Sequence, residues 1–257
     1  MREILEKISK KVSDAVCSIP QPSDIGEEIY VGADGTPTCR IDKIAEDIVL
    51  ETLDEMELPW NVLSEEVGFV DKGGDKTLVL DPIDGTHNAL LGIPFYSTSL
   101  AVGESSMCSV EAGLVRNLVT NEVFFAQKGM GAMRGKTRLQ VRSYSPDESA
   151  FLVYLGRYAD NDSMKVARIP ARTRSLGCAS LEMCMVAEGK LDAYYMNCEV
   201  HEKSIRIVDI AASALILREA GGKLVDLEGR NLDMPFDLNA RSNFLAFGDP
   251  EVKKVIL

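Results

Sequence analysis

Histidine is nearly absent from this chain: His87 and His201 are the only two among its 257 residues. Cysteine is present, but no two of the six cysteines form a C-x-x-C pair: Cys17, Cys39, Cys108, Cys178, Cys184 and Cys198. Zinc sites use closely spaced cysteine and histidine ligands, so this composition argues against a His-rich zinc site. Reduced thiols are the simplest interpretation, and they favour a cytoplasmic protein.

The sequence also lacks an excess of positive charge. Its formal net charge is -12, and its pI is near 4.8. Without a basic field to meet a phosphate backbone, nucleic acid is not expected as a partner. A small phosphorylated substrate remains compatible, because bound cations reverse the local sign of charge. No apolar window reaches transmembrane length, and the N-terminal MREILEKISKK has no apolar signal region, so no membrane partner is expected.

Alternating helical and strand patterns predict an α/β or α+β fold with layered elements. In the first half they predict helices over 4–19 and from Asp42, a strand over 77–80, and hairpin strands over 96–141. In the second half they predict strands within 146–156, 191–196, 222–229 and 244–248, and helices over 179–189 (amphipathic) and 207–220. A soft boundary over 142–148 divides the chain into an N-terminal half, 1–143, and a C-terminal half, 144–257.

Two glycine-rich segments are interpreted as turns or loops. Glycines 129, 131 and 135 come close to a dinucleotide fingerprint, but no strand-then-helix context supports one, so a hairpin turn is expected. Residues 21–38, QPSDIGEEIYVGADGTPT, are rich in glycine, proline and polar residues, which predicts an exposed loop.

The stretch LDPIDGTHN, residues 80–88, places two aspartates at the end of an apolar run. Asp-Pro and Asp-Gly are common turn dipeptides, so each residue alone is more typical of a turn than of a site. Pro82 disfavours a helical conformation at Asp81, so we expect a bend in the chain there. Such a bend would leave the Ile83 carbonyl beside the two carboxylates.

A second acidic segment, Glu65 and Glu66, follows a short apolar run upstream. If the two segments are neighbouring strands, three carboxylates and the Ile83 carbonyl form an oxygen cage that suits Mg²⁺ or Mn²⁺. Gly85 and Thr86 come next, and free backbone N–H groups at a helix start there would bind an anion. Together these features predict a metal-assisted phosphate site.

Glu65-Glu66, DPIDGT and VDIAASALILREAGG resemble the signature of the inositol monophosphatase superfamily over almost the whole chain. The dual inositol-1-monophosphatase/fructose-1,6-bisphosphatases of archaea and bacteria are closest in character. The resemblance implies a layered αβαβα sandwich and a phosphomonoesterase that uses two or three Mg²⁺ ions, with Mn²⁺ possible. It also implies hydrolysis of inositol-1-phosphate and/or fructose 1,6-bisphosphate by metal-activated water, in a homodimer.

The same resemblance implies roles for individual residues. The implied metal ligands are Glu65, Asp81, the Ile83 carbonyl, Asp84 and Asp209. The implied catalytic residues are Asp42, Glu65 and Thr86, of which Asp42 and Thr86 orient and deprotonate the attacking water. The implied substrate contacts are Asp84, Gly85, Thr86, Arg174, Gly177, Cys178, Ala179 and Glu202. Glu66 would lie behind the ligands, and the 21–38 loop would close over the site with another metal. Asp42 and Asp209 are also typical acids of a helix N-terminus.

The glutamate that binds sugar hydroxyls in inositol-specific relatives has two candidate positions here. Counting forward from the strand gives Met196, and counting back from Asp209 gives Glu202, because MNCEVHEKSIR holds extra residues. We prefer Glu202, since the helix start is the firmer anchor. Arg206 is an alternative contact for a second phosphate.

Two alternative functions stay open. The first is a phosphatase of 3′-phosphoadenosine nucleotides, although nucleotide-type relatives are usually longer. The second belongs to another class, a non-catalytic metal-binding regulatory subunit with the same fold. Such a subunit would be expected to have lost a metal carboxylate or Thr86, and the sequence retains all of them.

Overall fold

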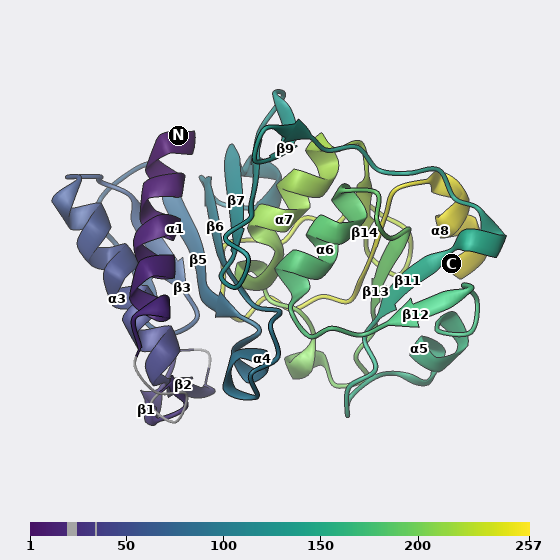
Figure 1. Cartoon of the computed structure of the whole chain (residues 1–257), viewed down its shortest axis with the longest axis horizontal. Helices are drawn as coiled ribbons and strands as arrows, with labels where there is room; N and C mark the ends of the chain where they lie inside the picture. The colour runs from purple at the N-terminus through teal and green to yellow at the C-terminus, as the bar shows by residue number, and fades with distance from the viewer. Residues whose placement is uncertain (20–24, 34) are drawn as a thin grey trace.

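The computed structural model describes residues 1–19, 25–33 and 35–257, and its elements stack as helix, sheet, helix, sheet, helix (Figure 1). In spatial order, the eight-stranded sheet contains β10 (Thr137–Arg138), β9 (Gly131–Arg134), β8 (Val123–Gln127), β7 (Ala112–Asn117), β6 (Ser97–Gly103), β5 (Thr77–Asp84), β3 (Asn61–Ser64) and β4 (Gly68–Val70). The five-stranded sheet contains β12 (Arg172–Arg174), β11 (Ala150–Val153), β13 (Ala193–Met196), β15 (Phe244–Phe247) and β14 (Lys223–Val225). This layering confirms the expected αβαβα sandwich.

Helices form the other three layers. On the outer face of the larger sheet lie α1 (Arg2–Cys17) and α3 (Arg40–Glu55). Between the sheets lie α6 (Ala179–Ala187) and α7 (Ile207–Glu219). On the outer face of the smaller sheet lie α5 (Asn161–Val166) and α8 (Pro250–Ile256). A short helix, α4 (Thr86–Leu90), follows β5.

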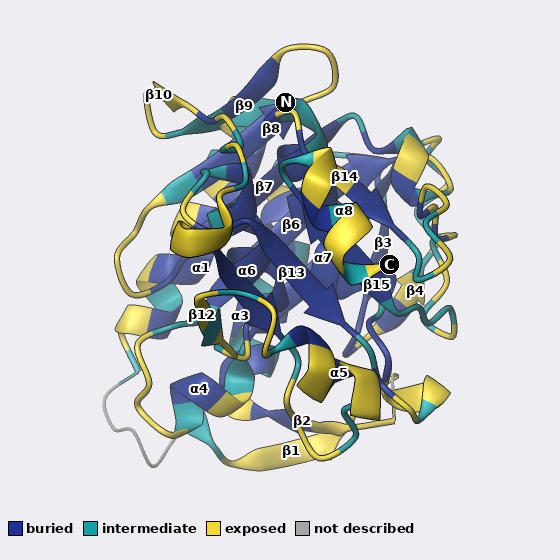
Figure 2. Ribbon diagram, turned by 90° about the vertical axis from the view of Figure 1, so that its right-hand side faces the viewer, coloured by how far each residue is buried: buried dark blue, intermediate teal, exposed yellow. Residues whose placement is uncertain are grey.

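The central layer is buried on all sides, as Figure 2 shows by the dark colour of α6 and α7. The sequence predicted an amphipathic α6, and that prediction is wrong, because only Met185 of its nine residues is partly exposed. A helix between two sheets meets apolar side chains on both faces and needs no polar face of its own. The larger core cluster of the protein therefore lies here, with α7 packed against β6 and β7.

Strand β5 runs four residues further than the sequence predicted. Its pairing with β6 shifts between Asp81, which lies opposite Ser99, and Asp84, which lies opposite Ser97. The expected bend at Pro82 is therefore a bulge within the strand rather than its end. The expected hairpin turn near residue 129 is confirmed, because Gln127 pairs with Gly131 where β8 turns into β9.

The described part of the predicted 21–38 loop contains a small hairpin, β1 (Glu28–Val31) paired with β2 (Pro37–Cys39). All residues of β1 are exposed, as expected (Figure 2). The Ala33 N–H donates to the Glu66 carbonyl at 2.9 Å, and the Thr38 hydroxyl donates to the buried Glu66 carboxylate. These bonds join the hairpin to the end of β3. Residues 20–24 and 34 of this region lie outside the described residues, and closure over the site stays a prediction.

The predicted boundary between residues 143 and 144 falls between the two sheets, whose strands span 61–138 and 150–247. Helices α6 and α7 come from the C-terminal half but share one core with the larger sheet, so the division into halves stays a prediction. Within the described ranges, no helix is both long and apolar enough to cross a bilayer. All six cysteines are free thiols.

Candidate active site

Three carboxylates from separate elements meet at the ends of two neighbouring strands. Glu65 directly follows β3, and Asp81 lies in β5, which pairs with β3 in parallel. Because Ser64 lies opposite Leu80, the next residue of each strand emerges at the same edge of the sheet. Asp209 reaches this edge from the first turn of α7, as predicted. One oxygen atom of Glu65, Asp81 and Asp209 lies within 4.8 Å of each of the others.

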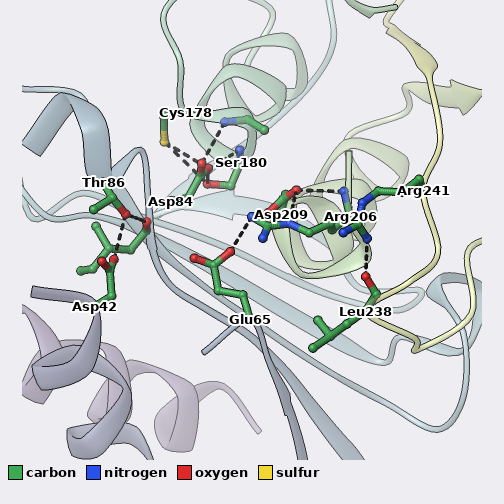
Figure 3. A network of polar contacts seen from close by, with 12 residues as sticks. Asp42, Glu65, Asp84, Thr86, Cys178, Ser180, Arg206, Asp209, Leu238 and Arg241 are labelled. Carbon is green, nitrogen blue, oxygen red and sulfur yellow. Dashed lines mark hydrogen bonds and ion pairs between the residues drawn. The ribbon is translucent and has the colours of Figure 1, made fainter. Parts of the chain in front are cut away.

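This acidic cluster (Glu65, Asp81 and Asp209) contains more negative charge than its described neighbours neutralise. Burial raises the pKa of Glu65 and of Asp81 well above the ordinary values, and neighbouring carboxylates raise them further. Oδ1 of Asp81 is buried, with no hydrogen-bond partner among the residues that the structure describes. Nη2 of Arg206 lies 2.5 Å from Glu65 Oε2 and 3.0 Å from Asp209 Oδ1 (Figure 3). A buried oxygen without a partner, among further carboxylates, suits a divalent cation with oxygen ligands.

Asp84 has different surroundings, because its carboxylate is directed toward the N-terminus of α6 (Figure 3). Its Oδ2 accepts from the Ser180 N–H at 2.6 Å and hydroxyl at 2.5 Å, and the Cys178 thiol donates to it at 3.1 Å. Its Oδ1 accepts from the Ala179 N–H at 3.2 Å. Burial raises the pKa of Asp84 to about 6, and the Ser180 hydrogen bonds oppose this rise. Its role as a metal ligand beside Asp81 stays a prediction.

Gly85 and Thr86 form the turn between β5 and α4. Gly85 has a φ of +87°, and a Cβ at this position would lie 3.2 Å from the Cβ of Cys178, so the turn requires glycine. The Thr86 hydroxyl oxygen lies 2.8 Å from both Asp42 Oδ1 and the Ile83 carbonyl oxygen, and its single proton serves one of them at a time. The contact between Thr86 and Asp42 holds the turn against α3.

Asp42 makes contacts that are compatible with both roles that the sequence offered for it. Its Oδ2 accepts from the N–H of Cys39, the N-cap residue of α3, at 3.2 Å, while its Oδ1 faces Thr86. Burial raises the pKa of Asp42 to about 7, and the hydrogen bond from Thr86 opposes the rise. A carboxyl group with this pKa can take or give a proton near neutral pH.

The predicted substrate loop, residues 174–180, forms one wall of a cavity of about 550 Å³. Predicted site residues that line this cavity are Asp84, Gly177, Cys178, Ala179 and Asp209. Gly177 has a φ of +76°, which lets the loop turn its backbone into the cavity. Arg174 lies outside the lining, is exposed, and donates to the carbonyl of Thr173 at 2.8 Å.

Two buried side chains that the sequence analysis did not single out hold this loop in place. Asn88 donates through Nδ2 to the carbonyls of Leu176 at 2.7 Å and Phe95 at 2.8 Å. Oε1 of Glu182 accepts from the Leu176 N–H at 2.7 Å, and burial raises the pKa of Glu182 to about 7. Signals for both were present, because Asn88 ends the LDPIDGTHN motif and Glu182 interrupts an apolar helix.

Both candidate positions for the sugar-binding glutamate line a second cavity, of about 250 Å³. Met196 is buried at the end of β13, and Glu202 is exposed in the 3₁₀ turn His201–Lys203. Arg206 and Asp209 line this cavity and the larger one, so the two cavities adjoin at these side chains. The preference for Glu202 stays a prediction.

Comparison with known proteins gives one consistent family. The inositol monophosphatase family model matches residues 2–254. A fructose-1,6-bisphosphatase/inositol-1-monophosphatase of Methanothermobacter thermautotrophicus is 36% identical over 266 residues, covering 98% of this chain and 93% of the relative. A bifunctional NADP phosphatase/NAD kinase of Methanococcus maripaludis is 33% identical over 279 residues, covering 100% of this chain and 48% of that longer protein. The crystal structure of an inositol monophosphatase–fructose 1,6-bisphosphatase superposes with a TM-score of 0.88 at 30% identity, covering 100% of this chain and 98% of the other.

Proposed function

The chain belongs to the inositol monophosphatase family, and we propose that it is a metal-dependent phosphomonoesterase that hydrolyses small sugar or polyol phosphates. One observation carries the proposal: Asp209 of the acidic cluster lines one cavity together with Asp84 and residues 175–179 of the loop, and Gly85 packs against Cys178 of the same loop. Hydrolysis of a phosphate monoester depends mainly on positioning and on stabilising negative charge, which this arrangement supports.

The proposed cofactor is Mg²⁺, in two or three copies, with Mn²⁺ as the alternative. Glu65, Asp81 and Asp209 would hold it, and the Ile83 carbonyl and Asp84 would complete the ligand set. When bound, the ions would supply the positive charge that activates water and stabilises the leaving oxygen. Asp81 Oδ1, which has no hydrogen-bond partner in the described ranges, supports this assignment, because a buried carboxylate oxygen is costly without a compensating charge.

Thr86 and Asp42 would act on the attacking water. The Thr86 hydroxyl would orient the water and pass a proton to Asp42, and its distance of 2.8 Å from Asp42 Oδ1 supports this role. A pKa of about 7 keeps a large fraction of Asp42 ionised at neutral pH, as a base requires. Glu65 would be the third catalytic residue, and the backbone N–H groups of Gly85 and Thr86 would bind phosphate oxygens.

The proposed substrates are inositol-1-phosphate and fructose 1,6-bisphosphate, in line with the name of the Methanothermobacter relative. The predicted contacts to the sugar are Arg174, Gly177, Cys178, Ala179 and Glu202. Gly177, Cys178 and Ala179 line the larger cavity, which supports their assignment. Two finer points of the proposal are a homodimer, which rests on the family resemblance, and a cytoplasmic location, which rests on the free thiols.

A nucleotide substrate is the second candidate. The Methanococcus maripaludis relative matches this whole chain and is named for NADP phosphatase activity, in a protein about twice as long. The cavity beside the acidic cluster, of about 550 Å³, is large enough for more than a sugar ring, and Tyr154 and Tyr194 line it. Tyr154, which is partly exposed, is the one of the two whose ring could stack on a base, because Tyr194 is buried against Phe244.

The test is phosphate release with Mg²⁺ titrated from zero. The panel contains inositol-1-phosphate, fructose 1,6-bisphosphate, NADP and 3′-phosphoadenosine phosphate. We expect release that depends on Mg²⁺ and falls about 100-fold or more in Thr86→Val, which keeps the side-chain shape without the hydroxyl. Stabilisation of Thr86→Val by Mg²⁺ against heat should be retained. No release from any substrate, by a folded protein that binds Mg²⁺, would favour the non-catalytic alternative.

A further inference from the structure

Arg206 is a cation placed within the acidic cluster. Its Nη2 lies 2.5 Å from Glu65 Oε2 and 3.0 Å from Asp209 Oδ1, and its Nε lies 3.3 Å from Asp209 Oδ2 (Figure 3). Burial alone would lower the pKa of Arg206, but the charges of Asp209 and Glu65 outweigh it and raise the pKa, so the guanidinium stays charged. Glu65 and Asp209 thus already share a positive partner that belongs to the chain.

A metal ion would need the same space. Oxygen ligands lie about 2.0 to 2.1 Å from Mg²⁺. The guanidinium contacts both oxygens of Asp209 and Oε2 of Glu65, so an ion held between these two acids would approach oxygens that Arg206 already contacts. The guanidinium could not stay beside such an ion, because two like charges would meet at short range in a partly buried site. Asp81 differs from Glu65 in its charged contacts: among the described residues both Asp81 Oδ1 and Glu65 Oε2 lack a hydrogen bond, but only Glu65 Oε2 has a close ion pair with Arg206.

The local backbone allows the side chain to leave without unfolding the helix. Arg206 is the N-cap residue of α7, and its backbone N–H donates to Asp209 Oδ2 at 2.9 Å, independently of the guanidinium. Arg206 also lines both cavities, of about 250 and 550 Å³, so each offers room for the displaced group. A long side chain with a capped backbone and cavity volume on two sides can change rotamer without moving the helix, and the ion pairs that it gives up set the cost that the arriving ion must offset.

We propose that Arg206 is a tethered competitor of the metal: the guanidinium and a divalent cation exclude each other at Glu65 and Asp209. One cation would then bind readily at Asp81, and a further cation would bind at Glu65 and Asp209 only after displacing Arg206. The inference rests on the proposed metal dependence, and it adds that the chain itself sets the affinity of the later ion. Its displaced charge would face the cavity in which a substrate lies.

The test is calorimetric titration of Mn²⁺ into protein stripped of metal by a chelator, with no substrate present. Arg206→Met keeps the length of the side chain, removes its charge and offers no oxygen ligand. We expect the weaker class of Mn²⁺ sites in the wild type to bind at least about tenfold more tightly in Arg206→Met. An unchanged or weaker affinity in the variant overturns the proposal.

Arg241→Met is the matched control. Arg241 lines the same smaller cavity, but its guanidinium donates to backbone carbonyls, those of Leu238, Ala240 and Glu202. A gain in Mn²⁺ affinity below about threefold is expected, since only the general field changes. An equal gain in both variants overturns the proposal, because removal of any nearby charge would then suffice. Absence of Mn²⁺ binding from both the wild type and Arg206→Met would overturn the metal part of the proposed function as well.

A second measurement is made on the wild type, which keeps the Arg206 guanidinium. It therefore tests the proposal even if Arg206→Met does not fold. The Arg206 Nε–H signal in the nuclear magnetic resonance spectrum of the wild type can be assigned by its absence from Arg206→Lys. Saturating Mg²⁺ should shift this signal and speed its exchange with water at least about tenfold, because the ion pairs to Glu65 and Asp209 break. A signal that is unchanged at saturation, in protein that binds Mg²⁺, contradicts displacement.

Discussion

Asp81 and Asp84 lie three residues apart on one strand and are both buried, yet the parts of the site around them differ in charge balance. Asp81 belongs to the acidic cluster and has a buried oxygen for which the described residues provide no hydrogen-bond partner. Asp84 accepts hydrogen bonds from two N–H groups, a hydroxyl and a thiol at the start of α6. The bulge between them directs the two carboxylates to different neighbours.

The difference in hydrogen bonding between Asp81 and Asp84 separates a contribution to metal binding from a contribution to the stability of the fold. A carboxylate whose acceptor capacity is filled by the protein stabilises the fold, whereas one left without a partner costs free energy until a cation arrives. We therefore expect Asp81 to contribute mainly to activity. Asp84 should contribute to activity and to the attachment of α6. The predictions below test this separation, from the largest expected effect to the smallest.

The largest effect is expected for Asp81→Asn. Removal of a metal-binding carboxylate should lower kcat by about 10³-fold or more, which corresponds to about 4 kcal/mol. In chelator, the variant should be more stable than the wild type, because burial of the charge at Asp81 no longer opposes folding. Steady-state kinetics and urea unfolding, with chelator and with Mg²⁺, measure both effects. A variant that is less stable than the wild type in chelator would remove the proposed contrast with Asp84.

The positions of the three acids of the acidic cluster could be predicted, because each acid belongs to a recognisable local pattern, a strand end or a helix start. The sequence predicts that Glu65 and Asp81 each follow a short apolar strand, and parallel neighbours bring such positions to one edge, although β5 in fact continues past Asp81 to Asp84. Asp209 precedes an apolar run, which indicates the first turn of a helix. Short-range patterns thus give the places of all three acids on their elements, but the assignment of Asp209 to the cluster came from the family resemblance, and the structure places all three carboxylates together.

The surroundings of Asp84 and Arg206 could not be predicted in the same way. The partner of Asp84 is Ser180, 96 residues further along the chain, and nothing near Asp84 indicates α6. Arg206 is an unusual N-cap residue, so helix-capping preferences did not place it over Asp209. The amphipathic interpretation of α6 failed for a similar reason, since a second sheet covers the face expected to be exposed. Long-range packing decides each of these features.

The second largest effect concerns Glu182, a carboxylate with protein partners in the Asp84 part of the site. Its pKa is raised to about 7 by burial, while the unfolded chain keeps the ordinary value of 4.5. The folded state therefore binds the extra proton between these values. The contribution of Glu182 to stability is fully present below pH 4.5 and is lost as pH rises to about 7. The loss due to Glu182 should reach about 3 kcal/mol.

Glu182→Gln removes this titration while its amide oxygen can still accept from the Leu176 N–H. The stability of the variant relative to the wild type should therefore increase by about 3 kcal/mol between pH 4.5 and pH 8. Urea unfolding of both proteins across this pH range measures the difference in their free energies of unfolding. The contributions of the other titrating groups are common to both proteins and cancel in this difference. A constant difference across the range would mean that Glu182 is ionised in the folded protein throughout.

A smaller effect is expected from paired serine substitutions on the two sides of the comparison. Ser180→Ala removes the hydroxyl that donates to Asp84 at 2.5 Å and should cost about 1 to 2 kcal/mol. Ser99, opposite Asp81, has a buried hydroxyl with no hydrogen-bond partner among the described residues. Ser99→Ala should therefore be neutral or slightly stabilising. Urea unfolding at pH 8, where Asp84 is ionised, compares the stability of the two variants. Equal losses of unfolding free energy would show that both serines act only through packing.

The smallest effect is expected at the edge of the site, where sugar hydroxyls would be recognised. If Glu202 binds a hydroxyl, Glu202→Gln should raise KM for inositol-1-phosphate by about tenfold, because an amide is a weaker acceptor than a carboxylate. The value of kcat should change little, since the contact is as strong in the ground state as in the transition state. Met196→Leu tests the other alignment with an apolar side chain of similar volume, and its KM should stay within about twofold of the wild type. The opposite result, a large change for Met196 and none for Glu202, would place the sugar at the buried end of β13 and away from the exposed 3₁₀ turn.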